Sequence, residues 1–191
     1  MDHVIALPDA DHERIVTRLS HELATALSIE LAGAAQGPPH ITLVSYTGLH
    51  PDAAARALSA VTADVAPFTV RAHGYGVFTG DEPADLSLHV MVVRTRALDE
   101  LHRRIHAALA AAGARLAGIT RPSVWTPHIT LIDQGLTPTL LGQAIELLAR
   151  RPHRRWSIAV SSLVVASRAD GDGTRPCVLH LGKSAASAPF T

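Results

Sequence analysis

The pentapeptide Pro-His-Ile-Thr-Leu occurs twice in this sequence, at residues 39–43 and again at 127–131. Each copy carries an imidazole and a hydroxyl two residues apart: His40 with Thr42, and His128 with Thr130. Histidine titrates near neutral pH and can act as a base or as an acid, and a hydroxyl can donate a hydrogen bond to a charged oxygen. Two such pairs facing one another would suit an in-line displacement at phosphorus, with a base on one side and an acid on the other.

The segments that carry the two motifs, residues 40–47 and 128–133, are β-branched and typical of strands. Side chains two residues apart on a strand point to the same face. The histidine and threonine of each motif are therefore predicted to share one face, while the isoleucine and leucine enter a core. A rigid strand is a suitable mount for a precise site.

The elements around the motifs are predicted to repeat as well. Helical periodicity and capping residues predict helices at 9–33, 50–65, 95–113 and 136–151, and strands at 3–7, 40–47, 68–78, 85–93, 128–133, 156–167 and 175–183. Both histidines and both threonines of the motifs are separated by 88 residues. An identical pentapeptide would recur by accident in a chain of this length on the order of a few times in a hundred. The pattern indicates an internal duplication.

Composition favours one compact globular unit. The chain has 191 residues, of which 47% are hydrophobic and 18% charged, and its formal net charge is zero. A neutral chain does not favour broad capture of long nucleic acid, which usually requires a basic surface, but a local site for a small anionic ligand remains open. Cys177 is the only cysteine, so no intramolecular disulfide can form.

No segment of the sequence resembles a signal peptide or approaches the roughly 20 apolar residues of a membrane-spanning helix. We therefore expect a cytoplasmic protein that makes no membrane contact, and we expect a monomer. Residues 1–183 are predicted to form a single domain of two similar lobes, followed by a flexible tail at 184–191.

The paired H-x-T motifs and the order of elements resemble the two-histidine (2H) phosphoesterase superfamily, which includes RNA 2′,5′-ligase-like proteins and cyclic nucleotide phosphodiesterases. The resemblance runs from about residue 3 to residue 183. It implies an α+β fold with a pseudo-twofold duplication, in which two antiparallel sheets line a central groove and helices lie outside. It also implies catalytic roles for His40 and His128, phosphate binding by Thr42 and Thr130, and no metal or other cofactor.

The resemblance implies a substrate as well. We expect a phosphodiesterase that hydrolyses the 2′,3′-cyclic phosphate of a nucleotide or RNA end to a 2′-phosphate. Alternatives are a 2′,5′-phosphodiester activity, either RNA ligation or cleavage of 2′,5′-oligoadenylate, and a non-catalytic nucleotide-binding module. The segments that follow the motifs, "VSYTG" and "IDQG", lack the basic or aromatic pair that is frequent in ligase-like members, and this disfavours a structured RNA end.

Other residues are candidates for base or phosphate contacts. An aromatic residue shortly before the second histidine is common in the family, and Trp125 matches it, with stacking on a base as the functional interpretation and burial as the alternative. Arg121 precedes the second motif and is a candidate phosphate contact. Tyr46, together with Tyr75 and Phe78, is a candidate for a base pocket.

Further histidines are candidates for metal ligands or groove residues. His102 and His106 have a helical spacing that could chelate zinc, but they lack the glutamate of a metalloprotease motif, and a solvated helix face is predicted for them. His89 and His180 lie on predicted strands, for which simple structural placement is favoured over lining of the groove.

Overall fold

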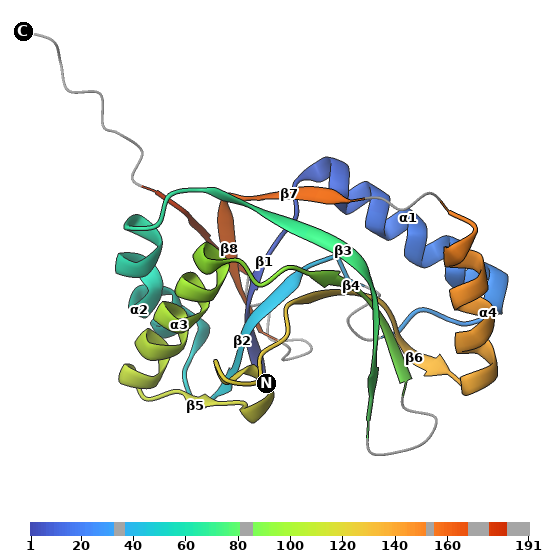
Figure 1. Cartoon of the computed structure of the whole chain (residues 1–191). Coiled ribbons are helices and arrows are strands. Elements are labelled where there is room, and N and C mark those ends of the chain that lie inside the picture. Colours follow the sequence, from blue (N-terminus) through green and yellow to red (C-terminus); the bar gives the residue numbers. More distant parts are fainter. Residues whose placement is uncertain (33–36, 81–85, 152–154, 168–175, 183–191) are drawn as a thin grey trace, which may run out of the picture.

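The computed structural model describes residues 1–32, 37–80, 86–151, 155–167 and 176–182 (Figure 1). Within these residues the chain forms four α-helices and one nine-stranded sheet in which every strand pair is antiparallel. The predicted α+β class is confirmed. The tail predicted at 184–191 lies outside the described residues.

The helices are α1 (Ala10–Leu27), α2 (Pro51–Ala63), α3 (Arg96–Ala111) and α4 (Pro138–Ala149). The strands are β1 (Asp2–Ala6), β2 (Ile41–Thr47), β3 (Phe68–Thr79), β4 (Leu86–Val92), β5 (Arg115–Leu116), β6 (His128–Leu136), β7 (Trp156–Val160), β8 (Ser162–Ala166) and β9 (Cys177–His180). A 3-10 helix, η2, spans Gly118–Thr120.

The strand order β7-β3-β4-β6-β2-β1-β8-β9 divides the sheet into two half-sheets at its centre. The half-sheet β7-β3-β4-β6 contains the second motif, and the half-sheet β2-β1-β8-β9 contains the first. The two motif strands, β2 and β6, pair only through Ile41 and Ile129. The two sheets expected from the sequence are thus joined at a single residue pair inside the motifs.

Two residue pairs reveal the predicted pseudo-twofold relation. Ile41 pairs with Ile129, and Val70 pairs with Ile158, so both pairs join residues that are 88 positions apart, the spacing of the motifs. When equivalent residues of a repeat pair directly in antiparallel register, a local twofold axis passes between them. The axis therefore runs through the β2–β6 contact and the β3–β7 contact.

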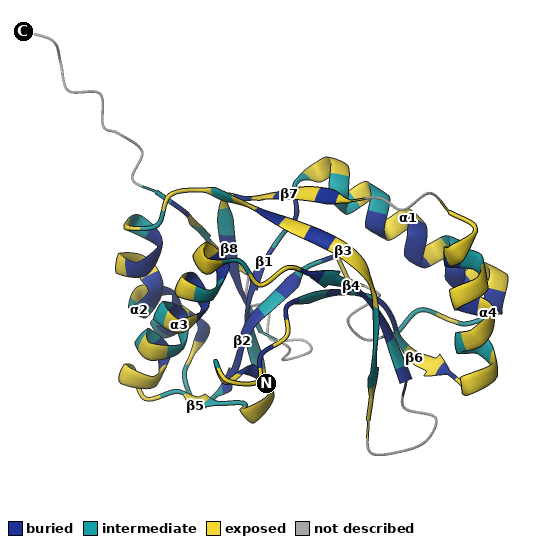
Figure 2. Ribbon diagram, in the orientation of Figure 1, coloured by how far each residue is buried: buried dark blue, intermediate teal, exposed yellow. Residues whose placement is uncertain are grey.

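The helices cover the sheet in two pairs, each of which mixes the two halves of the chain. Helices α2 and α3 pack together beside β2 and β8, and helices α1 and α4 pack together beside β6 on the other side of the molecule (Figure 1). Their apolar faces are buried toward the strands (Figure 2). On α1 the buried apolar residues are Val16, Leu19, Leu23, Ala24 and Leu27, and on α3 they are Leu98, Leu101, Ile105 and Leu109.

Several element boundaries follow local rules. Thr137 caps α4 through its hydroxyl, with Pro138 in the first turn, as the sequence predicted. Helix α1 ends at Leu27, earlier than predicted, because Ser28 adopts a left-handed conformation with φ of 53°. The strand predicted at 156–167 is two strands, β7 and β8, interrupted at Ser161. The two-residue strand β5 and the 3-10 helix were not predicted.

Candidate active site

The two motifs have the alternation of burial that the sequence predicted. Ile41, Leu43, Ile129 and Leu131 are fully buried, whereas His40, Thr42, His128 and Thr130 are half-buried. The isoleucine and leucine of each motif anchor the strand in the core. The histidines and threonines are left on the accessible face, where they can meet a ligand.

Each motif histidine makes the same hydrogen bond to the backbone. Nδ1 of His40 lies 2.9 Å from the carbonyl oxygen of Pro38, and Nδ1 of His128 lies 2.8 Å from the carbonyl oxygen of Thr126. A carbonyl oxygen only accepts, so Nδ1 must carry the hydrogen in both rings. In both cases Nε2 is left as the nitrogen that can take up or give a proton.

The contact between the motif strands brings the four motif residues together. Because β2 and β6 run antiparallel through Ile41 and Ile129, the residues on either side of this pair meet in opposite order. His40 comes beside Thr130, and Thr42 comes beside His128. The hydroxyls of Thr42 and Thr130 make no hydrogen bond with the residues that the structure describes. They are available to an oxyanion between the two imidazoles.

Two further rings lie against His128. His89, on β4, pairs with Thr130 and its ring centroid is 4.5 Å from that of His128; Phe78, on β3, lies 4.8 Å from His128 in an edge-to-face arrangement. His89 is only 2% exposed, in line with the structural placement favoured for it, and from this buried position its ring contacts that of His128. Only its place on a predicted strand could have pointed to it, because the pairing with Thr130 is long-range.

The surroundings of His128 and His89 favour their neutral forms. Burial lowers the pKa of His128, and the nearby His40 lowers it further, while the Thr126 carbonyl and Asp133 act in the opposite direction. Burial also lowers the pKa of His89 to about 3, with His128 acting in the same direction. Nε2 of His89 lies 2.8 Å from the Ser87 hydroxyl, whereas its Nδ1 is buried without a described partner.

Trp125 does not face a nucleotide site. Its side chain is only 4% exposed, its ring stacks on His102 at 3.9 Å, and its Nε1 donates to the carbonyl oxygen of Thr42 at 3.0 Å. A buried indole cannot stack on a base, so that interpretation is wrong and the alternative of burial holds. The indole instead fastens the loop before the second motif to the strand of the first motif.

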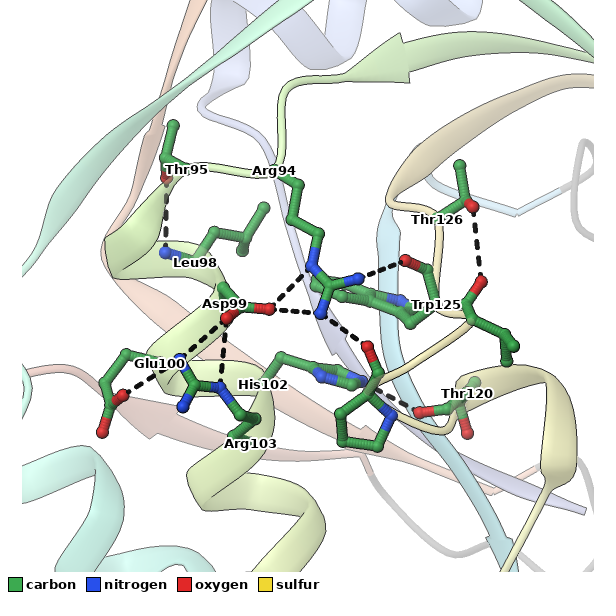
Figure 3. Close-up of polar contacts among 12 residues, drawn as sticks. Arg94, Thr95, Leu98, Asp99, Glu100, His102, Arg103, Thr120, Trp125 and Thr126 are labelled. Carbon is green, nitrogen blue, oxygen red and sulfur yellow. Dashed lines mark hydrogen bonds and ion pairs between the residues drawn. The ribbon is translucent and has the colours of Figure 1, made fainter.

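Arg94 and His102 hold the same loop in place (Figure 3). Arg94 donates to the carbonyl oxygens of Pro122 at 2.6 Å and Trp125 at 3.1 Å, and it forms an ion pair with Asp99 in the first turn of α3. Nε2 of His102 donates to the carbonyl oxygen of Thr120 at 3.0 Å. The solvated face predicted for His102 is wrong, because this side chain is fully buried beneath the loop.

Two other predicted contacts, by Tyr46 and by Arg121, have different outcomes. Tyr46 is fully buried, its hydroxyl has no described partner, and burial raises its pKa to about 12. It is a core residue, and its assignment to a base pocket is wrong. Arg121 is exposed, and its Nε donates to the carbonyl oxygen of Gly118 in its own turn at 3.2 Å. A phosphate contact by Arg121 stays a prediction.

The described residues were compared with two requirements: a cluster of side chains that can bind a metal ion, and a long apolar helix that can span a membrane. Among the described residues, no group of three or more His, Cys, Asp or Glu side chains could hold a metal ion. Within the same residues, none of the helices combines the length and the apolar character that a membrane span requires.

The two buried histidines predict a loss of stability in acid. Burial lowers the pKa of His102 to about 4 and that of His89 to about 3, whereas the unfolded chain titrates near pH 6.5. Below about pH 6.5 the unfolded state binds the proton more readily, so the free energy of unfolding falls with pH until the folded pKa is reached. Between pH 7 and 5 each histidine should remove about 2 kcal/mol, measurable by urea denaturation.

The variant His102→Gln isolates one of these contributions. Glutamine retains a donor for the Thr120 carbonyl but does not titrate in this range, so the variant should lose about 2 kcal/mol less than the native protein between pH 7 and 5. An identical loss in both proteins would contradict the assignment to His102.

Comparison with known proteins agrees with this architecture. The family model of the 2'-5' RNA ligase superfamily matches residues 7–172. TT0787 of Thermus thermophilus is 16% identical, with a TM-score of 0.62 and coverage of 95% of each chain. E. coli LigT, solved as a complex with 3'-AMP, is 20% identical, with a TM-score of 0.53 and coverage of 95% of this chain and 96% of LigT. No curated protein matches the chain.

The fold, with one H-x-T motif on each of two adjoining strands, matches the fold of these solved structures. The chain belongs to the 2'-5' RNA ligase superfamily, since the family model covers most of its length.

Proposed function

We propose that this protein is a phosphodiesterase that opens 2′,3′-cyclic phosphates of nucleotides or RNA ends without a metal ion. The observation that carries the proposal is the matched pair of histidines on adjoining strands, each with Nδ1 bonded to a backbone carbonyl and Nε2 left for proton transfer. One imidazole on each side of a phosphate supplies both proton transfers of an in-line displacement.

The surroundings of His128 support a division of roles between the two histidines. Because burial lowers the pKa of His128, its Nε2 carries a lone pair at neutral pH and takes the proton of the attacking water. His40 is the acid of the pair and gives a proton from Nε2 to the leaving 3′ oxygen. The new bond joins the water oxygen to phosphorus, the bond from phosphorus to the 3′ oxygen breaks, and the product is a 2′-phosphate.

The threonines complete the site. The hydroxyls of Thr42 and Thr130 donate to the non-bridging phosphate oxygens, whose negative charge must be stabilised during the displacement. Both side chains are half-buried beside the opposite motif's histidine, which is where such a donor is needed. E. coli LigT, which has a similar fold, was solved with a bound nucleotide, 3'-AMP, and this supports a nucleotide as the ligand here.

The test is turnover of the four 2′,3′-cyclic mononucleotides with and without a chelator, across pH 5 to 9. We expect chelator-resistant hydrolysis with a bell-shaped pH dependence and a 2′-phosphate product. Loss of activity with the chelator would contradict the metal-independent mechanism. Turnover confined to 2′,5′-linked oligomers would contradict the cyclic substrate and indicate a 2′,5′-phosphodiesterase. Nucleotide binding without any turnover would indicate a recognition module.

A further inference from the structure

The two motif strands have outer neighbours in matching register, so their environments can be compared position by position. Strand β1 places Ile5 opposite Thr42 of the first motif, and strand β4 places His89 opposite Thr130 of the second. Thr42 and Thr130 are equivalent by the repeat. Ile5 and His89 therefore occupy equivalent positions in the two half-sheets.

The same comparison extends to the next strand. His3 lies two residues before Ile5 and pairs with Ala166 on β8, and Ser87 lies two residues before His89 and pairs with Phe78 on β3. Ala166 and Phe78 are therefore equivalent as well. The half-sheet of the first motif has an isoleucine and an alanine where that of the second has a histidine and a phenylalanine.

These two substitutions within the repeat give His128 surroundings that differ from those of His40. The rings of Phe78 and His89 lie 4.8 and 4.5 Å from the His128 ring and 4.5 Å from one another. Both meet His128 edge to face, with interplanar angles of 87° and 71°, a favoured geometry for aromatic pairs. No ring contact to His40 is made by the residues that the structure describes.

We propose that Phe78 and His89, here called the aromatic clamp, are positioning residues that exclude water from His128 and thereby make it the base of the pair. The role of His128 as the base rests on the proposed function. The exclusion of water from its ring does not depend on that function. The strand pairing shows that the first half-sheet lacks both rings, so the clamp distinguishes two otherwise equivalent histidines.

The charged and titratable groups around His128 are consistent with this role. His40 faces it from β2, Asp133 lies on its own strand, and His89 faces it from β4. His89 is only 2% exposed and burial lowers its pKa to about 3, so it carries no charge at neutral pH. Its effect on His128 is therefore one of packing and exclusion of water, as it is for Phe78.

The experiment is an NMR titration of the His128 ring in the full chain, with its signal assigned from its absence in His128→Ala. Four variants form two matched pairs: Phe78→Ala with Phe78→Leu, and His89→Ala with His89→Ile. Each alanine opens space for water, and Phe78→Ala also copies the residue at the equivalent position, Ala166. Leucine and isoleucine keep apolar bulk, and His89→Ile copies Ile5.

In the native protein we expect His128 to titrate below the ordinary histidine value of about 6.5. The two alanine variants should move the midpoint up toward that value, and the acidic limb of kcat/KM should move with it. The leucine and isoleucine variants should keep the midpoint close to native. An unchanged midpoint in both alanine variants, or a native midpoint at or above about 6.5, would overturn the inference.

The outcomes separate this inference from the proposed function. If no cyclic phosphate is turned over but the alanine variants raise the His128 midpoint, the clamp stands and the function fails. If the native protein is active and the midpoint does not respond, the function stands and the clamp fails. The leucine and isoleucine variants remove the rings but keep apolar bulk. A native His128 midpoint in them would show that loss of the ring alone does not disturb the fold around His128.

Discussion

Replacing either motif histidine with alanine is expected to lower turnover of a 2′,3′-cyclic nucleotide by about 10²- to 10⁴-fold, the usual contribution of a general acid or base. His40→Ala removes the proposed acid and His128→Ala the proposed base, and each ring is held by its own bond from Nδ1 to a backbone carbonyl. The measurement is steady-state kcat and KM across pH. The base variant should lose the acidic limb of the pH profile, and the acid variant the basic limb.

His21→Ala is a matched control, because His21 is exposed on helix α1 and should leave turnover unchanged. The double variant His40→Ala/His128→Ala should be less impaired than the product of the two single effects, since residues that act as a unit are not additive. Full activity in either single variant would exclude the paired mechanism. Loss of the opposite limb in each variant would reverse the roles of the two histidines.

Trp125→Ala is expected to have the largest effect on stability, with a cost of about 3–5 kcal/mol for the loss of a buried tryptophan. The indole fills space beneath the loop before the second motif, stacks on His102, and donates to the Thr42 carbonyl. Its removal also deletes the hydrogen bond from the indole to that carbonyl. Because domains are stable by only about 5–15 kcal/mol, the change should be plain in urea denaturation.

Trp125→Phe provides the matched comparison. Phenylalanine keeps an aromatic ring against His102 but lacks the N–H. Trp125→Phe should therefore lower the free energy of unfolding less than Trp125→Ala, because the phenyl ring still fills most of the site that alanine leaves empty. If Trp125→Ala instead left stability unchanged and weakened nucleotide binding, the indole would be a base-stacking residue after all and its buried position in the fold would be contradicted.

The sequence alone was sufficient for the motifs and for the direction of their side chains. Burial alternates within the two motifs at the start of β2 and β6 as the strand period requires, because the direction of a side chain on a strand depends on local backbone geometry. Helix periodicity and caps such as Thr137 are local in the same sense. The spacing of 88 residues also predicted the pseudo-twofold relation, which the Ile41–Ile129 pair makes explicit.

Trp125 and His102 show where sequence reasoning was insufficient. Histidine counts as polar in a helical pattern, yet His102 is buried because the loop after α3 packs over it and offers both the Thr120 carbonyl and the indole of Trp125. Neither partner is close to His102 in sequence. Whether such side chains face solvent or core depends on long-range packing, which local periodicity does not record.

By itself, therefore, the sequence determined the class of fold, the four motif residues and the chemistry they are suited to, since these depend on residue type and on local spacing. Only the tertiary structure decided how the two histidines differ. Phe78 and His89 reach His128 through strand pairings that join distant segments. The ring contacts that distinguish the surroundings of His128 from those of His40 are a property of that packed environment, and no motif encodes them.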